Sequence, residues 1–207
     1  MSQTEEFRVA AAGVPSTAQT GRGGPTASVA GAGTAADLPQ RLGLFWTFWR
    51  SIVPVGVPPK RGFDPSAVPP RLLPNLAIYE RIAPDHFRIR VMGTEVVRRV
   101  GIEGTGRNVL DLLPPGPGRD RIAGFMNALL DHPCGGRSVV EDLFPSGRRS
   151  SVDILRLPLA DADGRPRYLV SCSAEGREED YRDPDGPPIQ VSRPLRLDWL
   201  DIGHGTP

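Results

Sequence analysis

The stretch at residues 87–113 constrains the fold most, because two kinds of periodicity follow each other there within a short distance. Apolar residues from Phe87 to Val91 alternate with polar ones, and a period of two is typical of a half-buried strand. Thr94 then offers a hydroxyl that can cap a helix, and Gly101 ends the helical spacing as a C-cap glycine would. The pattern predicts a strand, a short helix, a glycine turn and a second short helical turn.

Periodicity elsewhere predicts the remaining elements. Aromatic and aliphatic residues recur at helical spacing over about 42–53, and 119–132 is the clearest helix in the chain. Alternating segments predict further strands at 76–82, 137–144, 150–159 and 167–174. The pattern is that of an α+β domain, a five-stranded antiparallel sheet with helices packed on one face.

Composition divides the chain into a domain and two ends. The 207 residues include 24 glycines and 23 prolines, which points to long irregular ends. We expect a disordered N-terminal tail at 1–37, a domain at 38–175, and an acidic linker with a C-terminal tail at 176–207. Apolar residues between Val191 and Ile202 indicate a short strand, a docking segment or a disordered tail.

Charge and hydropathy limit the partners. The net charge of +1 provides no overall field for nucleic acid or an anionic membrane. No apolar run approaches the ~20 residues that a membrane span requires, and the first residues are acidic where a signal peptide is basic. We therefore expect a cytoplasmic protein with no nucleic-acid and no membrane partner.

An enzyme site would have to be assembled from dispersed polar residues such as His132, Cys134 and Asp153. Cys134 follows a helix end, where the helix dipole raises the pKa of a thiol, and Cys172 alternates with core residues. Asp153 is expected to form a cross-strand pair with Arg149 or Arg156. We expect no catalytic residues, and the sequence indicates no metal and no cofactor.

The order of these elements resembles that of the PAS family, in the branch known as its fifth subfamily of small bacterial proteins. The resemblance is carried by the segments 71–76, 87–94 and 104–107 and by an aromatic entry made of Phe45, Trp46, Phe48, Trp49 and Arg50. It covers about residues 42 to 175. It implies the PAS fold and a broad role in sensing or protein interaction, and it supplies no reaction and no ligand.

The resemblance also implies a ligand pocket or packed core between helices and sheet. The residues placed there are Phe87, Ile89, Val91, Val96, Val100, Phe125, Met126 and Leu129. Arg98, Arg99 and Arg107 could hold an anionic ligand at the mouth of this pocket or form a solvated face. His132 could be an axial haem ligand, as in some haem-binding PAS domains, or a cation that offsets the dipole of its helix.

The helix at 42–53 carries aromatic residues on more than one stripe. Trp46 lies about 100° from Phe45 around the helix axis, and Phe48 and Trp49 add to the apolar surface. The helix could cover its own sheet or pair with a second protomer, so all four aromatics are candidates for a homodimer interface.

We therefore predict a non-enzymatic module for sensing or protein interaction. It would bind a small apolar ligand or a partner protein and signal to another chain. Two alternatives stay open, an enzyme built from dispersed polar residues and a purely structural dimerisation module.

Overall fold

The computed structural model describes residues 28–29, 35–143, 149–175 and 191–207. Most of the predicted tail at 1–37, and residues 176–190 of the predicted linker and tail at 176–207, lie outside this described part. Within 1–37, the described pieces are strand β1 (Ser28–Val29) and the short 3-10 helix η1 (Ala35–Asp37).

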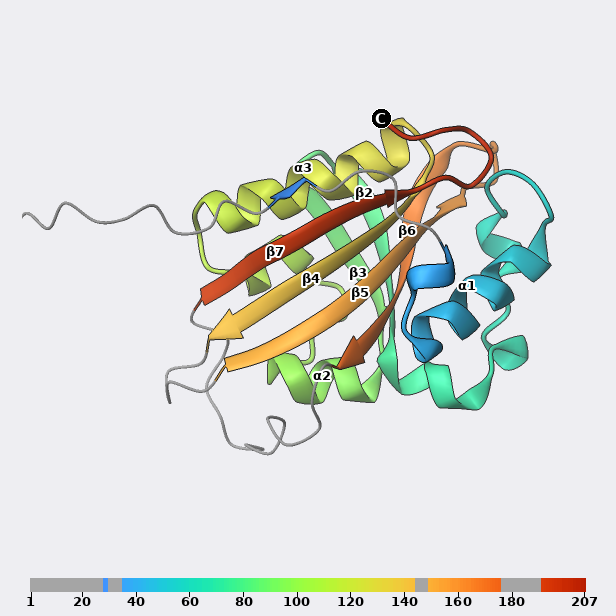
Figure 1. Ribbon diagram of the computed structural model, residues 1–207. Coiled ribbons are helices and arrows are strands. Elements are labelled where there is room, and N and C mark those ends of the chain that lie inside the picture. Colours follow the sequence, from blue (N-terminus) through green and yellow to red (C-terminus); the bar gives the residue numbers. More distant parts are fainter. Residues whose placement is uncertain (1–27, 30–34, 144–148, 176–190) are drawn as a thin grey trace, which may run out of the picture.

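One mixed sheet organises the domain (Figure 1). Its strand order is β1-β7-β4-β5-β6-β2-β3, and every neighbouring pair is antiparallel except β1 and β7. The strands are β1 Ser28–Val29, β2 Leu76–Ala83, β3 His86–Met92, β4 Gly135–Leu143, β5 Arg149–Ala160, β6 Pro166–Glu175 and β7 Val191–Leu200. Strands β2 to β6 are the five expected from sequence, and the α+β class is confirmed.

The C-terminal segment makes the sheet wider than the five strands predicted. β7 pairs with β4 from Gly135↔Leu200 to Leu143↔Val191, and β1 adds a parallel pair on the outer edge of β7. Pro194 lies beside the register shift in this ladder, where a strand can tolerate a missing N–H. The C-terminal segment forms a strand because it pairs with the edge of β4. The sequence of this segment alone does not indicate that pairing.

Helices cover both faces of the sheet rather than the one expected. α2 (Thr94–Val100) and α3 (Pro117–Asp131) lie on one face, and α1 (Gln40–Ile52) lies on the other (Figure 1). The physical reason is that β5 is apolar on both sides. Leu155 and Leu157 belong to the core beneath α1, whereas Ile154 packs against the core beneath α3. We call these the α1 core and the α3 core.

Helix α1 is tied to the sheet and to the C-terminal segment. Phe45 and Trp49 are fully buried in the α1 core, and the Trp49 indole donates a hydrogen bond of 3.2 Å to the Pro158 carbonyl. Arg50 donates a 3.0 Å bond to the carbonyl of Ile202, just beyond β7. The predicted helix therefore packs on its own domain through its main apolar stripe.

A register shift in β3 turns one predicted pocket residue outward. Ile78 pairs with Val91 but Tyr79 pairs with Ile89, so an extra residue interrupts the alternation. Val91 is consequently 45% exposed, and its placement in the pocket is wrong. Met92 takes the inward position instead.

The connection from β3 into α2 depends on a glycine rather than on the predicted threonine cap. Gly93 is the N-cap of α2, and no side-chain cap bond is formed there. A Cβ on Gly93 would lie 2.3 Å from the Pro74 carbonyl oxygen, so the chain can pass only without a side chain. Gly101 ends α2 with φ of 76°, as predicted for a C-cap glycine.

Candidate ligand pocket

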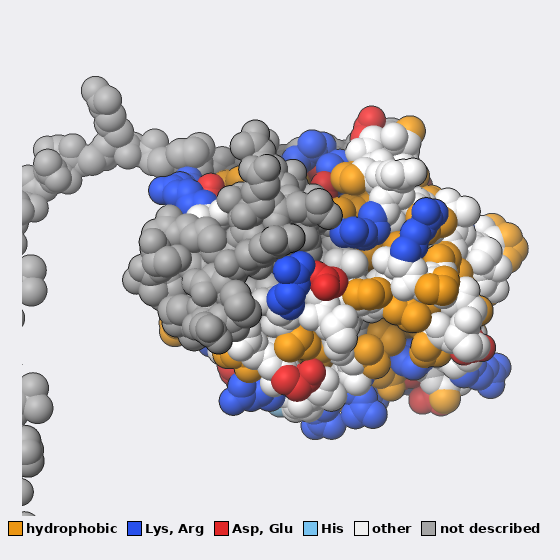
Figure 2. Space-filling model, turned by 90° about the horizontal axis from the view of Figure 1, so that it is seen from below, with side chains coloured by type: hydrophobic (Ala, Val, Ile, Leu, Met, Phe, Trp, Pro, Cys, Tyr) orange, Lys and Arg blue, Asp and Glu red, His pale blue; other side chains and the backbone are white. Residues whose placement is uncertain are grey.

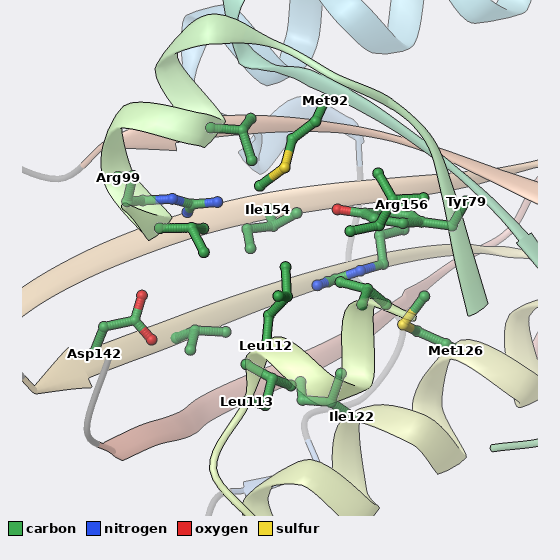
Figure 3. A pocket seen from close by; sticks show the side chains of 15 residues that line it. Tyr79, Met92, Arg99, Leu112, Leu113, Ile122, Met126, Asp142, Ile154 and Arg156 are labelled. Carbon is green, nitrogen blue, oxygen red and sulfur yellow. The ribbon is translucent and has the colours of Figure 1, made fainter. Parts of the chain in front are cut away.

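A cavity of about 80 Å³ lies between the α2–α3 side and the inner face of the sheet (Figure 3). Its walls come from β2 to β5, from α2 and α3, and from the 3-10 helix η5 (Val109–Leu112). The apolar lining residues are Ile89, Met92, Val96, Val100, Val109, Leu112, Leu113, Ile122, Met126, Val140 and Ile154. The polar lining residues are Tyr79, Arg99, Asp142 and Arg156.

The eight residues implied by the resemblance divide into three groups. Ile89, Val96, Val100 and Met126 line the cavity. The others that point inward are packed in the α3 core without lining the cavity, and they are Phe87, Phe125 and Leu129. Val91 is outside, as described above.

Arg156 is the polar residue that the sequence interpretation misplaced. It is 6% exposed, and its Nη1 donates a 2.6 Å hydrogen bond to Ser138 Oγ. The predicted cross-strand pair of Asp153 with an arginine is present, but the predicted partners Arg149 and Arg156 are wrong, because both lie with Asp153 in the same strand, β5. Asp153 instead binds Arg137, with Nη2 and Oδ2 2.6 Å apart. Arg149 pairs with Glu141.

Alternation in β5 is the signal that could have located Arg156. Leu155 and Leu157 flank it in sequence and face the α1 core, so Arg156 must face the pocket side with Ile154. Burial lowers the pKa of the Arg156 guanidinium, Tyr79 opposes this shift, and the nearby Arg99 adds to it.

Arg99 approaches the cavity from the last turn of α2, opposite Arg156. The side chains of both arginines point toward the middle of the pocket (Figure 3). The Nε atoms of both are buried and have no hydrogen-bond partner. Asp142 lines the same pocket from β4 and is 4% exposed.

The predicted cluster of three arginines is divided by the fold. Arg98 is exposed and bonds Glu95 on its own helix, and Arg107 is exposed in the glycine turn. Only Arg99 of the three lines the cavity. On the face that carries α2, basic side chains lie scattered among small groups of hydrophobic ones (Figure 2).

The candidate enzyme residues do not form a common cleft. Cys134 is buried in the α3 core, where burial, with a contribution from Asp201, raises the pKa of its thiol to about 12. Cys172 is buried in the α1 core, and burial raises the pKa of that thiol to about 12 as well. The direction agrees with the prediction for Cys134, although the main cause is burial rather than the helix dipole. Asp153 forms a salt bridge with Arg137.

His132 is the C-cap residue of α3 and does not line the cavity. Its Nε2 is buried without a hydrogen-bond partner.

Within the described part of the chain, no group of three His, Cys, Asp or Glu side chains is placed to hold a metal ion. The described helices also include none that is long and apolar enough to cross a membrane.

Comparison with family models decides the family. Residues 40–173, well over half of the chain, match the model described as a PAS domain. The chain belongs to the PAS family. The match is to the fifth PAS subfamily, as the sequence resemblance predicted, and PAS domains are generally sensory or interaction modules. No curated protein matches the chain.

Solved structures with a similar course of the chain are light-oxygen-voltage domains. The dark structure of the blue-light photoreceptor Aureochrome1 is 19% identical with a TM-score of 0.40, covering 53% of this chain and 80% of that one. A Rhodobacter sphaeroides light-oxygen-voltage protein is 14% identical with a TM-score of 0.40, covering 50% and 60%. An RNA-binding light-oxygen-voltage receptor is 18% identical with a TM-score of 0.42, covering 62% and 38%. At such identities the likeness concerns the fold alone.

Proposed function

We propose that this PAS domain is a non-enzymatic sensory module that binds a small ligand in the cavity beside α2. Ligand binding is then signalled to another protein. The observation that carries the proposal is the cavity itself, with apolar walls and buried polar groups that converge on it. A cavity of ~150 Å³ is known to hold benzene. The volume of about 80 Å³ therefore suits a ligand of only a few heavy atoms.

The response is a population shift, in which the ligand favours one arrangement of the elements around it. Val96 and Val100 of α2 line the cavity, so a bound ligand holds α2 in place. Helix α2 starts at Gly93, which lies against the Pro74 carbonyl of the 3-10 helix η4 (Pro70–Asn75). Leu72 of η4 belongs to the α1 core. Contact thus runs from the pocket through η4 to α1 on the far face.

A homodimer through α1 is part of the proposed function. Trp46 and Phe48 are partly buried against the α1 core and keep some exposed surface, whereas Phe45 and Trp49 are enclosed within their own chain. Trp46 and Phe48 lie about 160° apart around the helix axis, and Phe48 packs edge-on against Phe63 of its own chain. The proposed dimer contact is therefore reduced to the Trp46 side of the helix. A two-fold pairing covers both copies of this surface with one self-complementary patch.

A cytoplasmic location also fits the two cysteines. Cys134 and Cys172 are free and lie in different cores, on opposite faces of the sheet. The fold therefore does not depend on a disulfide, which suits a reducing compartment.

The methionines provide the test of ligand binding. Met92 and Met126 both line the cavity and are two of the three methionines in the chain. With ¹³C-methyl-methionine labelling, a mixture of small metabolites is expected to shift both methyl signals saturably. Native mass spectrometry of the purified protein would detect a ligand that is already bound.

A pair of α2 variants provides the control for this test. Val100→Phe adds bulk inside the cavity, and Val97→Phe adds the same bulk on the same helix at a residue that does not line it. We expect Val100→Phe to abolish the ligand-induced shifts and Val97→Phe to retain them. If no small molecule moves either methyl signal in the unmodified protein, the sensory function is wrong and a purely structural dimerisation module is favoured.

A further inference from the structure

The strongest unexplained feature of the pocket is the charge of Arg156. Arg156 is only 6% exposed. Its guanidinium donates a hydrogen bond to a neutral group, the hydroxyl of Ser138. Its Nε has no partner and its head points into the cavity (Figure 3). A guanidinium stays protonated in proteins, and a buried cation is costly unless an anion or further hydrogen bonds compensate it.

A second cation faces the first across the cavity. Arg99 also has a buried Nε without a partner, and its guanidinium points toward the middle of the same space (Figure 3). Two like charges that share a cavity disfavour each other, and the effect of Arg99 on the pKa of Arg156 has this sign. An anion between the two would offset the repulsion and accept hydrogen bonds from the two guanidinium groups.

We propose that the pocket binds a short-chain monocarboxylate of about two to four carbons, with its carboxylate between Arg156 and Arg99. The inference rests on the proposed function, because it names the ligand class of the same cavity. A planar carboxylate can accept two parallel N–H bonds from a guanidinium. The alkyl end packs among apolar side chains such as Met92, Val100 and Ile154.

Other ligand classes fit the lining less well. A wholly apolar ligand leaves both Nε atoms without an acceptor, at the cost of buried unsatisfied donors. A dicarboxylate brings its second charge toward Asp142, which lines the same cavity and is itself acidic and buried. A drug-sized molecule needs roughly 300 Å³ or more, against the cavity of about 80 Å³.

The direct test is a titration of ¹³C-methyl-methionine-labelled protein at constant ionic strength. The probes are acetate, propionate and butyrate, with propionamide as a neutral isostere and propylamine and succinate as charge controls. Propionate or butyrate is expected to shift the Met92 and Met126 methyl signals saturably and to bind at least about tenfold more tightly than propionamide, because its hydrogen bonds are charge-assisted.

Matched arginine variants locate the carboxylate. Arg99→Met and Arg156→Met are each expected to weaken propionate binding at least about tenfold and to leave propionamide binding unchanged. Arg98→Met removes the same charge from α2 outside the pocket and is expected to bind as the unmodified protein does. Should Arg156→Met fail to fold, Arg99→Met and the comparison of propionate with propionamide still decide the question.

The outcomes separate this inference from the function on which it rests. If propionamide binds as tightly as propionate, or if Arg99→Met keeps full propionate affinity, the carboxylate assignment is wrong while the pocket stays a ligand site. If neither carboxylates nor any neutral small molecule shifts the methyl signals, both the assignment and the sensory function are wrong. Tighter propionate binding that depends on Arg99 supports both.

Discussion

The rings of Phe125 in α3 and Trp199 in β7 are in contact, with centroids 4.8 Å apart and planes tilted by 38°. The contact joins the helix that forms one wall of the pocket to the strand that the sequence left undecided. Leu197 of β7 also belongs to the α3 core, whereas Leu200 belongs to the α1 core. One strand therefore contributes to the cores on both faces of the sheet.

This arrangement predicts that the C-terminal segment stabilises the PAS domain. Trp199→Ala removes the aromatic contact and is expected to lower the free energy of unfolding by about 2–4 kcal/mol, somewhat less than for a fully buried ring because Trp199 is partly exposed. Urea denaturation followed by circular dichroism measures the change. Leu195→Ala, at a residue of β7 that is 38% exposed, is the control and is expected to cost much less. Equal losses for the two variants would contradict the role assigned to β7.

Phe125 depends on a glycine in the neighbouring strand. A Cβ added at Gly136 would lie 2.6 Å from the Phe125 ring and 2.6 Å from Leu129. Phe125 is 4% exposed and does not line the cavity, so Phe125→Ala is expected to cost about 3–5 kcal/mol of stability. Gly136→Ala is also expected to destabilise the protein, because the ring and Leu129 must move.

The two changes at this contact are expected to be coupled. In a double-mutant cycle, Gly136→Ala should cost less in the Phe125→Ala background, where the space beside the strand is partly open. The coupling free energy from thermal or urea denaturation is the measurement. Additive effects of the two substitutions would show that Phe125 does not occupy the position described.

The sequence predicted the elements that depend on local periodicity. Helix α3 and strands β2 to β6 carry their own pattern, and the ends of each were predicted to within about two residues without knowledge of the fold. Strand β7 could not be decided in this way, since its stability comes from pairing with β4, from Leu143↔Val191 to Gly135↔Leu200, far earlier in the chain. The helix on the second face of the sheet was not predicted for a similar reason. Apolar residues on both sides of β5 indicate a second covered face only when the position of α1 is known.

The pocket was predicted in part for equally physical reasons. Alternation placed Ile89 correctly, but the register shift beside Ile78 has no signature in the sequence and turned Val91 outward. Arg156 was detectable, because it shares a side of β5 with Ile154. It was assigned instead to a cross-strand pair with Asp153 because opposite charges on neighbouring strands commonly pair.

The buried thiols predict a loss of stability in alkali. Burial raises the pKa of Cys134 and of Cys172 from 9.0 to about 12. Their contribution to stability is fully present below pH 9 and is lost as the pH rises from about 9 to about 12, since the unfolded chain then releases protons that the folded one keeps. Over this range each thiol should lower the free energy of unfolding by up to ~1.4 kcal/mol per pH unit.

The measurement compares the unmodified protein with Cys172→Ala by urea denaturation at pH 7, 9 and 10. The difference between the two proteins isolates the thiol, since other groups that titrate in alkali are common to both. We expect the variant to lose less stability than the unmodified protein between pH 9 and 10. Parallel losses would mean that Cys172 ionises as readily in the folded state as in the unfolded one.

The last prediction concerns the homodimer proposed for α1. The Trp46 ring stacks on Trp49 with centroids 6.0 Å apart, and the Arg50 guanidinium lies 5.2 Å from the Trp46 centroid. Because Trp49 and Phe45 carry the packing on the sheet, Trp46→Glu should leave the domain folded while it places a charge on the remaining apolar surface. Light scattering and sedimentation at micromolar concentrations are expected to show a dimer for the unmodified protein and weaker association for the variant. Thr47→Glu, at an exposed position on the same helix, adds the same charge and controls for it. A monomer in both cases would assign Trp46 to the packing of its own chain, beneath Arg50.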